Sequence, residues 1–165
     1  MKKVALFLDR DGVINKNPPK HDYVKSWDEF ILLPGVSDAI KLAKKHGFLV
    51  IVISNQRGVA RGFMSEKAVK DIHKRLNEQL SKFGTSIDAF YFCSHDYKDK
   101  CGCRKPRPGL ILKAASDHEI NLSKSILIGD SESDRLAGIK AHIKTVIILN
   151  NRSLSDVIKS FLKNE

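Results

Sequence analysis

Cysteine, long apolar runs and acidic residues are all scarce in this chain of 165 residues. The three cysteines are an odd number, so they cannot all be paired in disulfide bonds within the chain. The longest unbroken apolar run, residues 48–53, is far too short to cross a bilayer. The first twelve residues, MKKVALFLDRDG, lack the apolar stretch of a signal peptide. We therefore expect a cytoplasmic protein without a membrane partner, in which thiols stay reduced.

The shortage of acidic residues leaves a formal net charge of +10, from 29 lysines and arginines against 19 aspartates and glutamates. Such a charge favours an anionic partner, which could be nucleic acid or a phosphorylated small molecule. The lysines are spread along the chain, which is typical of solvated helix faces. Apolar residues make up 42% and charged residues 29%, as in ordinary globular proteins.

Short apolar runs alternate with segments of helical periodicity, and no internal repeat, low-complexity tract or linker interrupts them. This alternation predicts a parallel sheet covered on both faces, a single Rossmann-like three-layer α/β domain over residues 1–165. The last helix begins at Ser153, with Asp156 completing a capping box. The predicted strands are 4–8, 48–53, 89–92, 125–128 and 145–149, and the predicted helices are 36–46, 65–83, 108–118, 133–141 and the segment after 153.

Carboxylates follow two of these predicted strands. Asp9 and Asp11 come directly after the first strand and are two residues apart, so extended backbone points both side chains the same way. Asp130 follows the fourth strand, and in parallel sheets ligands bind at the carboxyl ends of the strands. Clustered carboxylates need a cation or a proton, and oxygen ligands suit Mg²⁺. We expect a magnesium site at this edge of the sheet.

Four motifs, each at the end of a predicted strand, resemble a known family. They are FLDRDGVIN, ISNQRGVARG, CRKPRPG and IGDSESDRLAG, and together they extend over nearly the whole chain. The chain is similar to the haloacid-dehalogenase-like phosphatases, in the branch that holds D-glycero-D-manno-heptose 1,7-bisphosphate phosphatase and histidinol-phosphate phosphatase. The spaces between the motifs leave no room for the cap domain that many relatives carry, so we expect a capless fold with an open site.

The resemblance implies a role for each catalytic residue. Asp9 would be the nucleophile that forms an aspartyl-phosphate, and Asp11 would be the general acid and base. Ser54 and Lys105 would hold the phosphoryl oxygens. The implied Mg²⁺ ligands are the carboxylates of Asp9 and Asp130 and the main-chain carbonyl of Asp11, and Asp134 would orient groups around the metal without binding it.

All three cysteines lie in one polar loop after the third predicted strand, residues 93–103. Cys93, His95, Cys101 and Cys103 give four ligands of the kind that zinc prefers, with no position left for water. A disulfide and a chance cluster are the alternatives, and the flanking CRKP sequence of the family favours a structural zinc site. Since the loop has few apolar residues, we expect the zinc to hold Arg104 and Lys105 in place.

The substrate is less closely specified than the chemistry. By analogy with the heptose enzymes, the expected substrate contacts are Asn55, Gln56, Arg57, Arg104, Lys20 and Ser131. Two positions depart from the family pattern: residue 131 is serine where a lysine is common, and Arg57 replaces a small residue. Arg57 or Lys20 would then supply the missing positive charge.

Three functions remain open on the sequence. The first is a phosphoric monoester hydrolase, monomeric and Mg²⁺-dependent, that acts on a phosphorylated sugar and removes the 7-phosphate of D-glycero-D-manno-heptose 1,7-bisphosphate. The second is a histidinol-phosphate phosphatase, which Arg57 and Arg104 disfavour because that substrate carries an amine. The third is a nucleic-acid 3′-phosphatase or a zinc-bearing nucleic-acid-binding module, although no stripe of arginine and aromatic residues supports a nucleic-acid partner.

Overall fold

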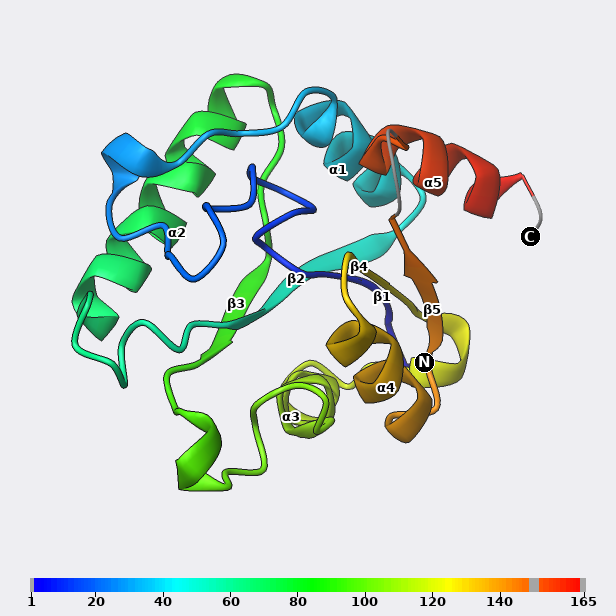
Figure 1. Cartoon of the computed structure of the whole chain (residues 1–165). Coiled ribbons are helices and arrows are strands. Elements are labelled where there is room, and N and C mark those ends of the chain that lie inside the picture. Colours follow the sequence, from blue (N-terminus) through cyan, green and yellow to red (C-terminus); the bar gives the residue numbers. More distant parts are fainter. Residues whose placement is uncertain (1, 149–151, 164–165) are drawn as a thin grey trace.

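A central sheet of five parallel strands organises the computed structural model, which describes residues 2–148 and 152–163 (Figure 1). The strand order is β3-β2-β1-β4-β5, and every neighbouring pair is parallel. The predicted strands are confirmed within two residues at each end, except that Leu149 lies outside the described residues. The strands are β1 (Val4–Leu8), β2 (Phe48–Asn55), β3 (Ala89–Cys93), β4 (Ile126–Gly129) and β5 (Lys144–Ile147).

In the described part of the chain, five α-helices connect or follow the strands, as the helical periodicity predicts. Ser65 accepts a hydrogen bond from the backbone of Ala68 at the start of α2, and the capping box of Ser153 and Asp156 starts α5. Gly47 follows the end of α1 with a φ of +82°, a conformation that glycine adopts at little cost. The helices are α1 (Val36–Lys45), α2 (Glu66–Lys82), α3 (Gly109–Asp117), α4 (Glu132–Lys140) and α5 (Leu154–Leu162).

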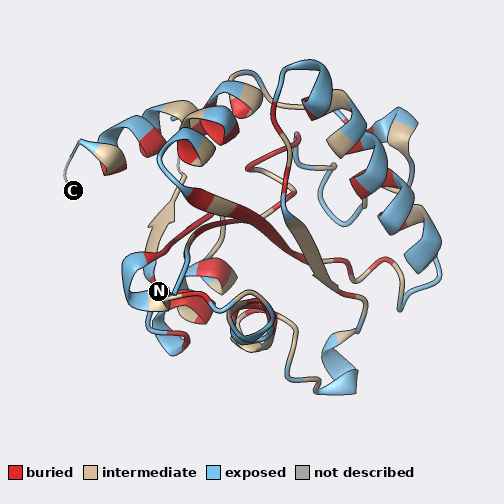
Figure 2. Cartoon of the chain, turned by 180° about the vertical axis from the view of Figure 1, so that it is seen from behind, coloured by how far each residue is buried: buried red, intermediate tan, exposed pale blue. Residues whose placement is uncertain are grey.

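The helices cover both faces of the sheet, with α1, α2 and α5 on one side and α3 and α4 on the other. Alternate residues of β1 point into the two cores: Leu6 and Leu8 pack with the first group of helices, and Ala5 and Phe7 with the second. Figure 2 shows the central strands as buried along most of their length. Burial on both faces accounts for the continuous apolar runs in the sequence.

Strand order reverses between β1 and β4. From β1 the chain continues outward through β2 and β3, then returns to place β4 and β5 on the other side of β1. Open α/β sheets bind ligands beside such a reversal, outside the carboxyl ends of the strands. Apart from β2, the elements between β1 and β3 are helices and loops, with no inserted cap among the described residues. No helix in the described part of the chain has the length and apolar character needed to span a membrane.

Candidate active site

Asp9 and Asp130 face each other across the point where strand order reverses. Asp9 follows β1 and Asp130 follows β4, and these strands are paired. Gly12, in the turn after Asp9, lies against Asp130 and has a φ of +85°. A Cβ atom at Gly12 would lie 1.9 Å from Oδ2 of Asp130, so the backbone of the DRDG turn passes too close to that carboxylate for any side chain. Glycine thus lets the turn after β1 pack against the Asp130 carboxylate.

Lys105 is the cation at the centre of the site. Its side chain is about 1% exposed, and its Nζ lies 2.9 Å from Oδ1 of Asp9 and 2.6 Å from Oδ1 of Asp134. Nζ also donates to the carbonyl of Ile53, at 3.0 Å. Three oxygens therefore fix the ammonium group beside the Asp9 carboxylate.

The backbone of Lys105 is held separately by Asn55, at the end of β2. Asn55 Nδ2 donates to the Lys105 carbonyl, and Asn55 Oδ1 accepts from the Lys105 N–H, both at 3.0 Å. The sequence prediction gave Asn55 a contact with substrate. In the structure its amide group joins β2 to the loop that carries Lys105, and the contact with substrate stays a prediction.

Asp11 is turned into a network of donors. Its carboxylate accepts from Nε and Nη2 of Arg10, from Nδ2 of Asn15 at 2.9 Å and from Nε2 of Gln56 at 3.1 Å. Gln56 also donates to the Ser54 hydroxyl, at 2.6 Å. The network connects β2 to the DRDG turn, and the Asp11 side chain remains 22% exposed at the edge of the site.

Asp134 is fully buried at the start of α4, and both of its oxygens are engaged. Oδ1 binds Lys105, and Oδ2 accepts from the backbone of Asp130 and Ser131 and from the Ser131 hydroxyl at 2.6 Å. This arrangement suits a residue that orients its neighbours. It also occupies the hydroxyl of Ser131, which the sequence analysis assigned to substrate.

Buried charge gives the site its electrostatic character. Burial raises the pKa of Asp9 to about 7, Asp134 and Asp11 add to the rise, and Lys105 opposes it. Burial also raises the pKa of Asp130. Burial alone would lower the pKa of Lys105, but Asp9 and Asp134 together raise it above its ordinary value. Burial therefore disfavours ionisation of Asp9 and Asp130, and the three negative charges of Asp9, Asp130 and Asp134 exceed the single positive charge of Lys105.

A divalent cation fits this surplus. Oxygens of Asp9, Asp130 and Asp134 lie within 4.8 Å of one another, a spacing compatible with ligands of one metal ion. Asp9 and Asp130 each have one carboxylate oxygen that accepts no hydrogen bond from a described residue. Both carboxylate oxygens of Asp134 accept hydrogen bonds. The Asp11 carboxylate is outside this group. The predicted use of its main-chain carbonyl stays a prediction.

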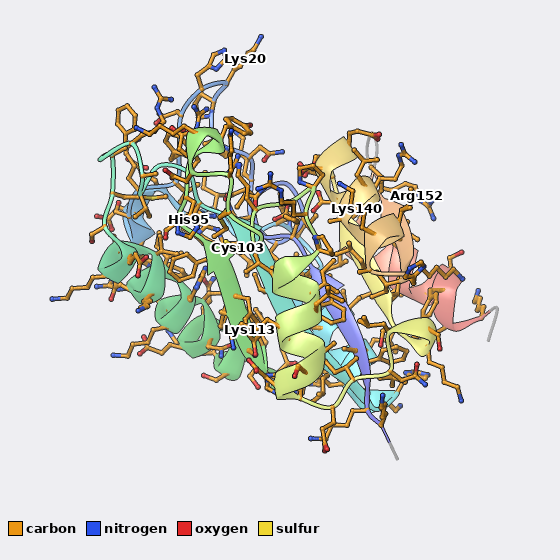
Figure 3. All side chains as sticks on the ribbon, turned by 90° about the horizontal axis from the view of Figure 1, so that it is seen from below. Lys20, His95, Cys103, Lys113, Lys140 and Arg152 are labelled. Carbon is orange, nitrogen blue, oxygen red and sulfur yellow. The ribbon has the colours of Figure 1, made fainter. Side chains whose placement is uncertain are left out.

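The four predicted ligands of the loop 93–103, which we call the metal loop, come together. The sulfur atoms of Cys93, Cys101 and Cys103 are 3.0 to 3.6 Å apart, and His95 Nδ1 is 3.2 Å from the Cys103 sulfur. Tetrahedral zinc bound at 2.3 Å would space its sulfur ligands about 3.8 Å apart. The cluster therefore fits a tetrahedral metal ion, with its ligand atoms slightly closer than that ideal. Figure 3 labels His95 and Cys103 side by side beyond β3.

The remaining predicted substrate residues differ in where they lie. The Gln56 side chain is buried in the network around Asp11. Arg57 Nε donates to Asp96 Oδ1 in the metal loop, at 2.5 Å. Arg104 lies in the exit of that loop, beside the ring of Tyr97. Lys20 is exposed and extends outward from its loop (Figure 3).

Arg10, Asn15 and Asn17 are site residues that the sequence analysis missed. Arg10 is fully buried and contacts both Asp11 and Gln56. Asn17 Nδ2 donates to Asp130 Oδ2 at 2.8 Å, which links the loop after β1 to the end of β4. An arginine between two aspartates is a signal that could have been used. The spacing of the asparagines carries no comparable signal.

Comparison with known proteins agrees with this geometry. The sequence profile of the family described as polynucleotide kinase 3 phosphatase matches residues 3–160. The chain belongs to this family. The resemblance to haloacid-dehalogenase-like phosphatases, drawn from four motifs, is thereby confirmed.

Relatives of this family member carry more specific names. A D-glycero-beta-D-manno-heptose-1,7-bisphosphate 7-phosphatase of Helicobacter pylori is 42% identical over 146 residues, covering 88% of this chain and 83% of the relative. A D-glycero-alpha-D-manno-heptose-1,7-bisphosphate 7-phosphatase of Mycobacterium tuberculosis is 45% identical, covering 79% of this chain and 68% of the relative. Among solved structures, D,D-heptose 1,7-bisphosphate phosphatase of B. bronchiseptica, complexed with magnesium and phosphate, has a TM-score of 0.90. It is 30% identical, and the match covers 98% of this chain and all of that one.

Proposed function

We propose that the chain is a Mg²⁺-dependent phosphatase that removes the 7-phosphate of D-glycero-D-manno-heptose 1,7-bisphosphate. The observation that carries the proposal is the contact of Asp9 with Lys105, at 2.9 Å, beside Asp130 at the reversal of strand order. A carboxylate nucleophile needs its charge offset before it can approach an anionic phosphate. The names of the relatives supply the substrate.

The reaction has two steps on this chain's own residues. An oxygen of Asp9 attacks phosphorus, the bond from phosphorus to the sugar oxygen breaks, and Asp11 gives that oxygen a proton. Asp11 then takes a proton from water as the water attacks phosphorus, which breaks the bond to Asp9 and frees inorganic phosphate. Lys105 and Ser54 stabilise charge on the phosphoryl oxygens.

Asp9 and Asp130, with the main-chain carbonyl of Asp11, would hold Mg²⁺. When bound, the ion supplies positive charge against the phosphoryl group. The free carboxylate oxygens support this ligand set. Asp134 keeps Lys105 and the start of α4 in position, which agrees with its full burial and its engaged oxygens.

We propose that the metal of the loop 93–103 is zinc, in a structural role. Three sulfurs and one imidazole nitrogen form the kind of closed set that zinc occupies in structural sites. The cytoplasm keeps thiols reduced and therefore suits such a site.

The end of the substrate that is not hydrolysed carries the other phosphate. Arg104 is next to the catalytic lysine, and its guanidinium group has no carboxylate partner among the described residues. Arginine binds phosphate through two parallel hydrogen bonds, so Arg104 is suited to that group. Relatives are named for both the alpha and the beta anomer, so the preferred anomer is a matter for the assay.

Phosphate release from a panel of substrates tests the proposal. The panel contains both anomers of the heptose 1,7-bisphosphate, heptose 7-phosphate, histidinol phosphate and a 3′-phosphorylated oligonucleotide. We expect kcat/KM to be highest for one of the bisphosphates. A preference for histidinol phosphate or for the oligonucleotide would overturn the assignment of substrate while leaving the Asp9 chemistry in place.

A further inference from the structure

Tyr97 gathers two arginines from different parts of the chain. It is the first residue of a short 3₁₀ turn, Tyr97–Asp99, within the metal loop. The guanidinium carbons of Arg57 and Arg104 each lie 4.4 Å from the centre of its ring. Arg57 comes from the segment after β2, and Arg104 from the exit of the metal loop. One ring therefore holds two cations at the mouth of the site.

The turn beneath Tyr97 is itself anchored. Asp96 Oδ1 accepts from the Tyr97 N–H at 2.6 Å, and the Asp96 N–H donates to Asp99 Oδ2 at 2.7 Å. The same Asp96 carboxylate pairs with Arg57, at 2.5 Å. The position of the ring is thus set by the metal loop, and Arg57 joins that loop to the end of β2.

Arg104 has unused donors. Its Nε and Nη1 are buried and have no hydrogen-bond partner among the described residues. Beside it is a cavity of about 320 Å³, to which Lys100, Arg107 and Lys140 also contribute. Asp96 is the one acid among the described residues that line this cavity, and it is already paired with Arg57. The surroundings of Arg104 therefore favour an anion.

Two guanidinium groups at one place repel each other, and long side chains lose conformational freedom when they are fixed. The face of an aromatic ring attracts a cation and offers a flat surface that orders it. Side chains ordered before binding do not have to be ordered by the ligand, which strengthens binding. Tyr97 is 64% exposed as a residue, so the position of its ring is not explained by packing in a core.

We propose that Tyr97 is a positioning residue, which orders Arg57 and Arg104 to bind the phosphate group that stays on the substrate. This inference rests on the proposed function, because a bisphosphate provides that second group. The Tyr97 hydroxyl makes no hydrogen bond with any described residue, so the ring face is the part that acts. Phenylalanine at position 97 should therefore preserve this role of Tyr97, and a non-aromatic residue should not.

The test compares Tyr97→Leu, which keeps apolar volume without an aromatic face, with Tyr97→Phe and with the unaltered protein. Lys98→Ala, in the same turn, is the matched control. Each protein is assayed with heptose 1,7-bisphosphate and with heptose 7-phosphate, which lacks the far phosphate. Metal content and Tm are measured in parallel.

We expect Tyr97→Leu to raise KM for the bisphosphate about tenfold, in keeping with the loss of cation–π contacts, while kcat stays within about twofold. Its kcat/KM for heptose 7-phosphate, its metal content and its Tm should be unchanged. Tyr97→Phe and Lys98→Ala should behave like the unaltered protein. In an Arg104→Ala background, Tyr97→Leu should add less than about twofold, because residues that act together are not additive.

An equal loss of kcat/KM for both substrates would mean that the ring supports the loop in general, and would overturn the proposal. So would an unchanged KM in Tyr97→Leu when the unaltered protein prefers the bisphosphate. If the unaltered protein shows no such preference, the proposed function has failed, which is a separate result from failure of the role of Tyr97.

Discussion

Asn55 and the backbone of Lys105 form two hydrogen bonds with each other, both 3.0 Å long. This pair of bonds connects the last residue of β2 to the loop that carries Lys105. The lysine side chain is fixed at its other end by Ile53 and Asp134. Lys105 is therefore held at its backbone and at its ammonium group by residues that do not depend on the metal loop.

Asn55→Ala should lower kcat roughly tenfold while Tm falls only modestly, because Lys105 loses its backbone anchor but keeps the contacts of its ammonium group. Asn77→Ala is a matched control. Asn77 makes the same two bonds with the backbone of Ile87, at 2.8 and 2.9 Å, just before β3 and so at the opposite edge of the sheet. The control should lose stability without losing kcat. Equal kcat in Asn55→Ala and the unaltered protein would show that the anchor is not needed.

Asp9→Asn should abolish turnover and leave the fold intact. A carboxamide cannot attack phosphorus to give the aspartyl-phosphate, whereas its shape matches that of the carboxylate. The measurement is phosphate release from heptose 1,7-bisphosphate, with circular dichroism as the check on folding. Turnover above about a thousandth of the original rate in a clean preparation contradicts the mechanism.

The sequence predicted the fold because its signals are local and repeated. Apolar runs such as residues 48–53 and helical spacing such as Val69, Ile72 and Leu76 each indicate one element, and the structure buries these residues except Leu49, which is partly buried. The motifs at strand ends gave Asp9, Lys105 and Asp130, because parallel strands bring their carboxyl ends to one edge. The metal loop was equally visible, since its four ligands lie close together in the sequence.

The sequence did not reveal which polar side chains face inward. Asn55 and Gln56 are neighbours in one motif, and both were assigned to substrate. The structure uses their amide groups inside the protein, one on the Lys105 backbone and the other on Asp11 and Ser54. Such pairings join residues that are far apart in the chain, and composition and spacing do not encode them.

Loss of a ligand in the metal loop should be kinetically distinct from loss of Lys105. The sequence alone led us to expect that the zinc holds Lys105 in place, and on that view the two variants would look alike. With Asn55, Ile53 and Asp134 in place, we expect Cys101→Ser to act mainly through Arg104. It should raise KM for the bisphosphate about tenfold, whereas Lys105→Ala should lower kcat a hundredfold or more.

Elemental analysis of the same variants measures their zinc content. The unaltered protein and Lys105→Ala should each contain about one zinc per chain when purified under reducing conditions without added metal, and Cys101→Ser should contain far less. Absence of zinc from the fresh, reduced, unaltered protein would favour the alternative that the three cysteines are clustered by chance. A collapse of kcat in Cys101→Ser to the level of Lys105→Ala would restore the original view that the zinc positions the lysine.

The buried side chain of His73 should make the free energy of unfolding depend on pH. It is a buried residue of α2, stacked on Phe90 with ring centres 4.5 Å apart, and its Nε2 has no partner among the described residues. Burial lowers its pKa to about 3, Arg10 lowers it further, and Asp11 opposes the fall. Because the unfolded chain binds a proton near pH 6.5 and the folded protein does not, stability is lost as pH falls from 6.5 towards 3. At pH 5 the loss from this residue is about 2 kcal/mol.

The measurement is urea unfolding of the unaltered protein and of His73→Phe at pH 7.5 and at pH 5. Phenylalanine keeps the stack on Phe90 and cannot be protonated. Any cost of fitting the larger ring is the same at both pH values and cancels in the difference between them. All other titrating groups are shared by the two proteins, so they cancel as well. The unaltered protein should lose about 2 kcal/mol more than His73→Phe between the two pH values. An equal loss in both proteins would mean that His73 takes up its proton as readily in the folded state as in the unfolded chain, which its burial against Phe90 and beside Arg10 argues against.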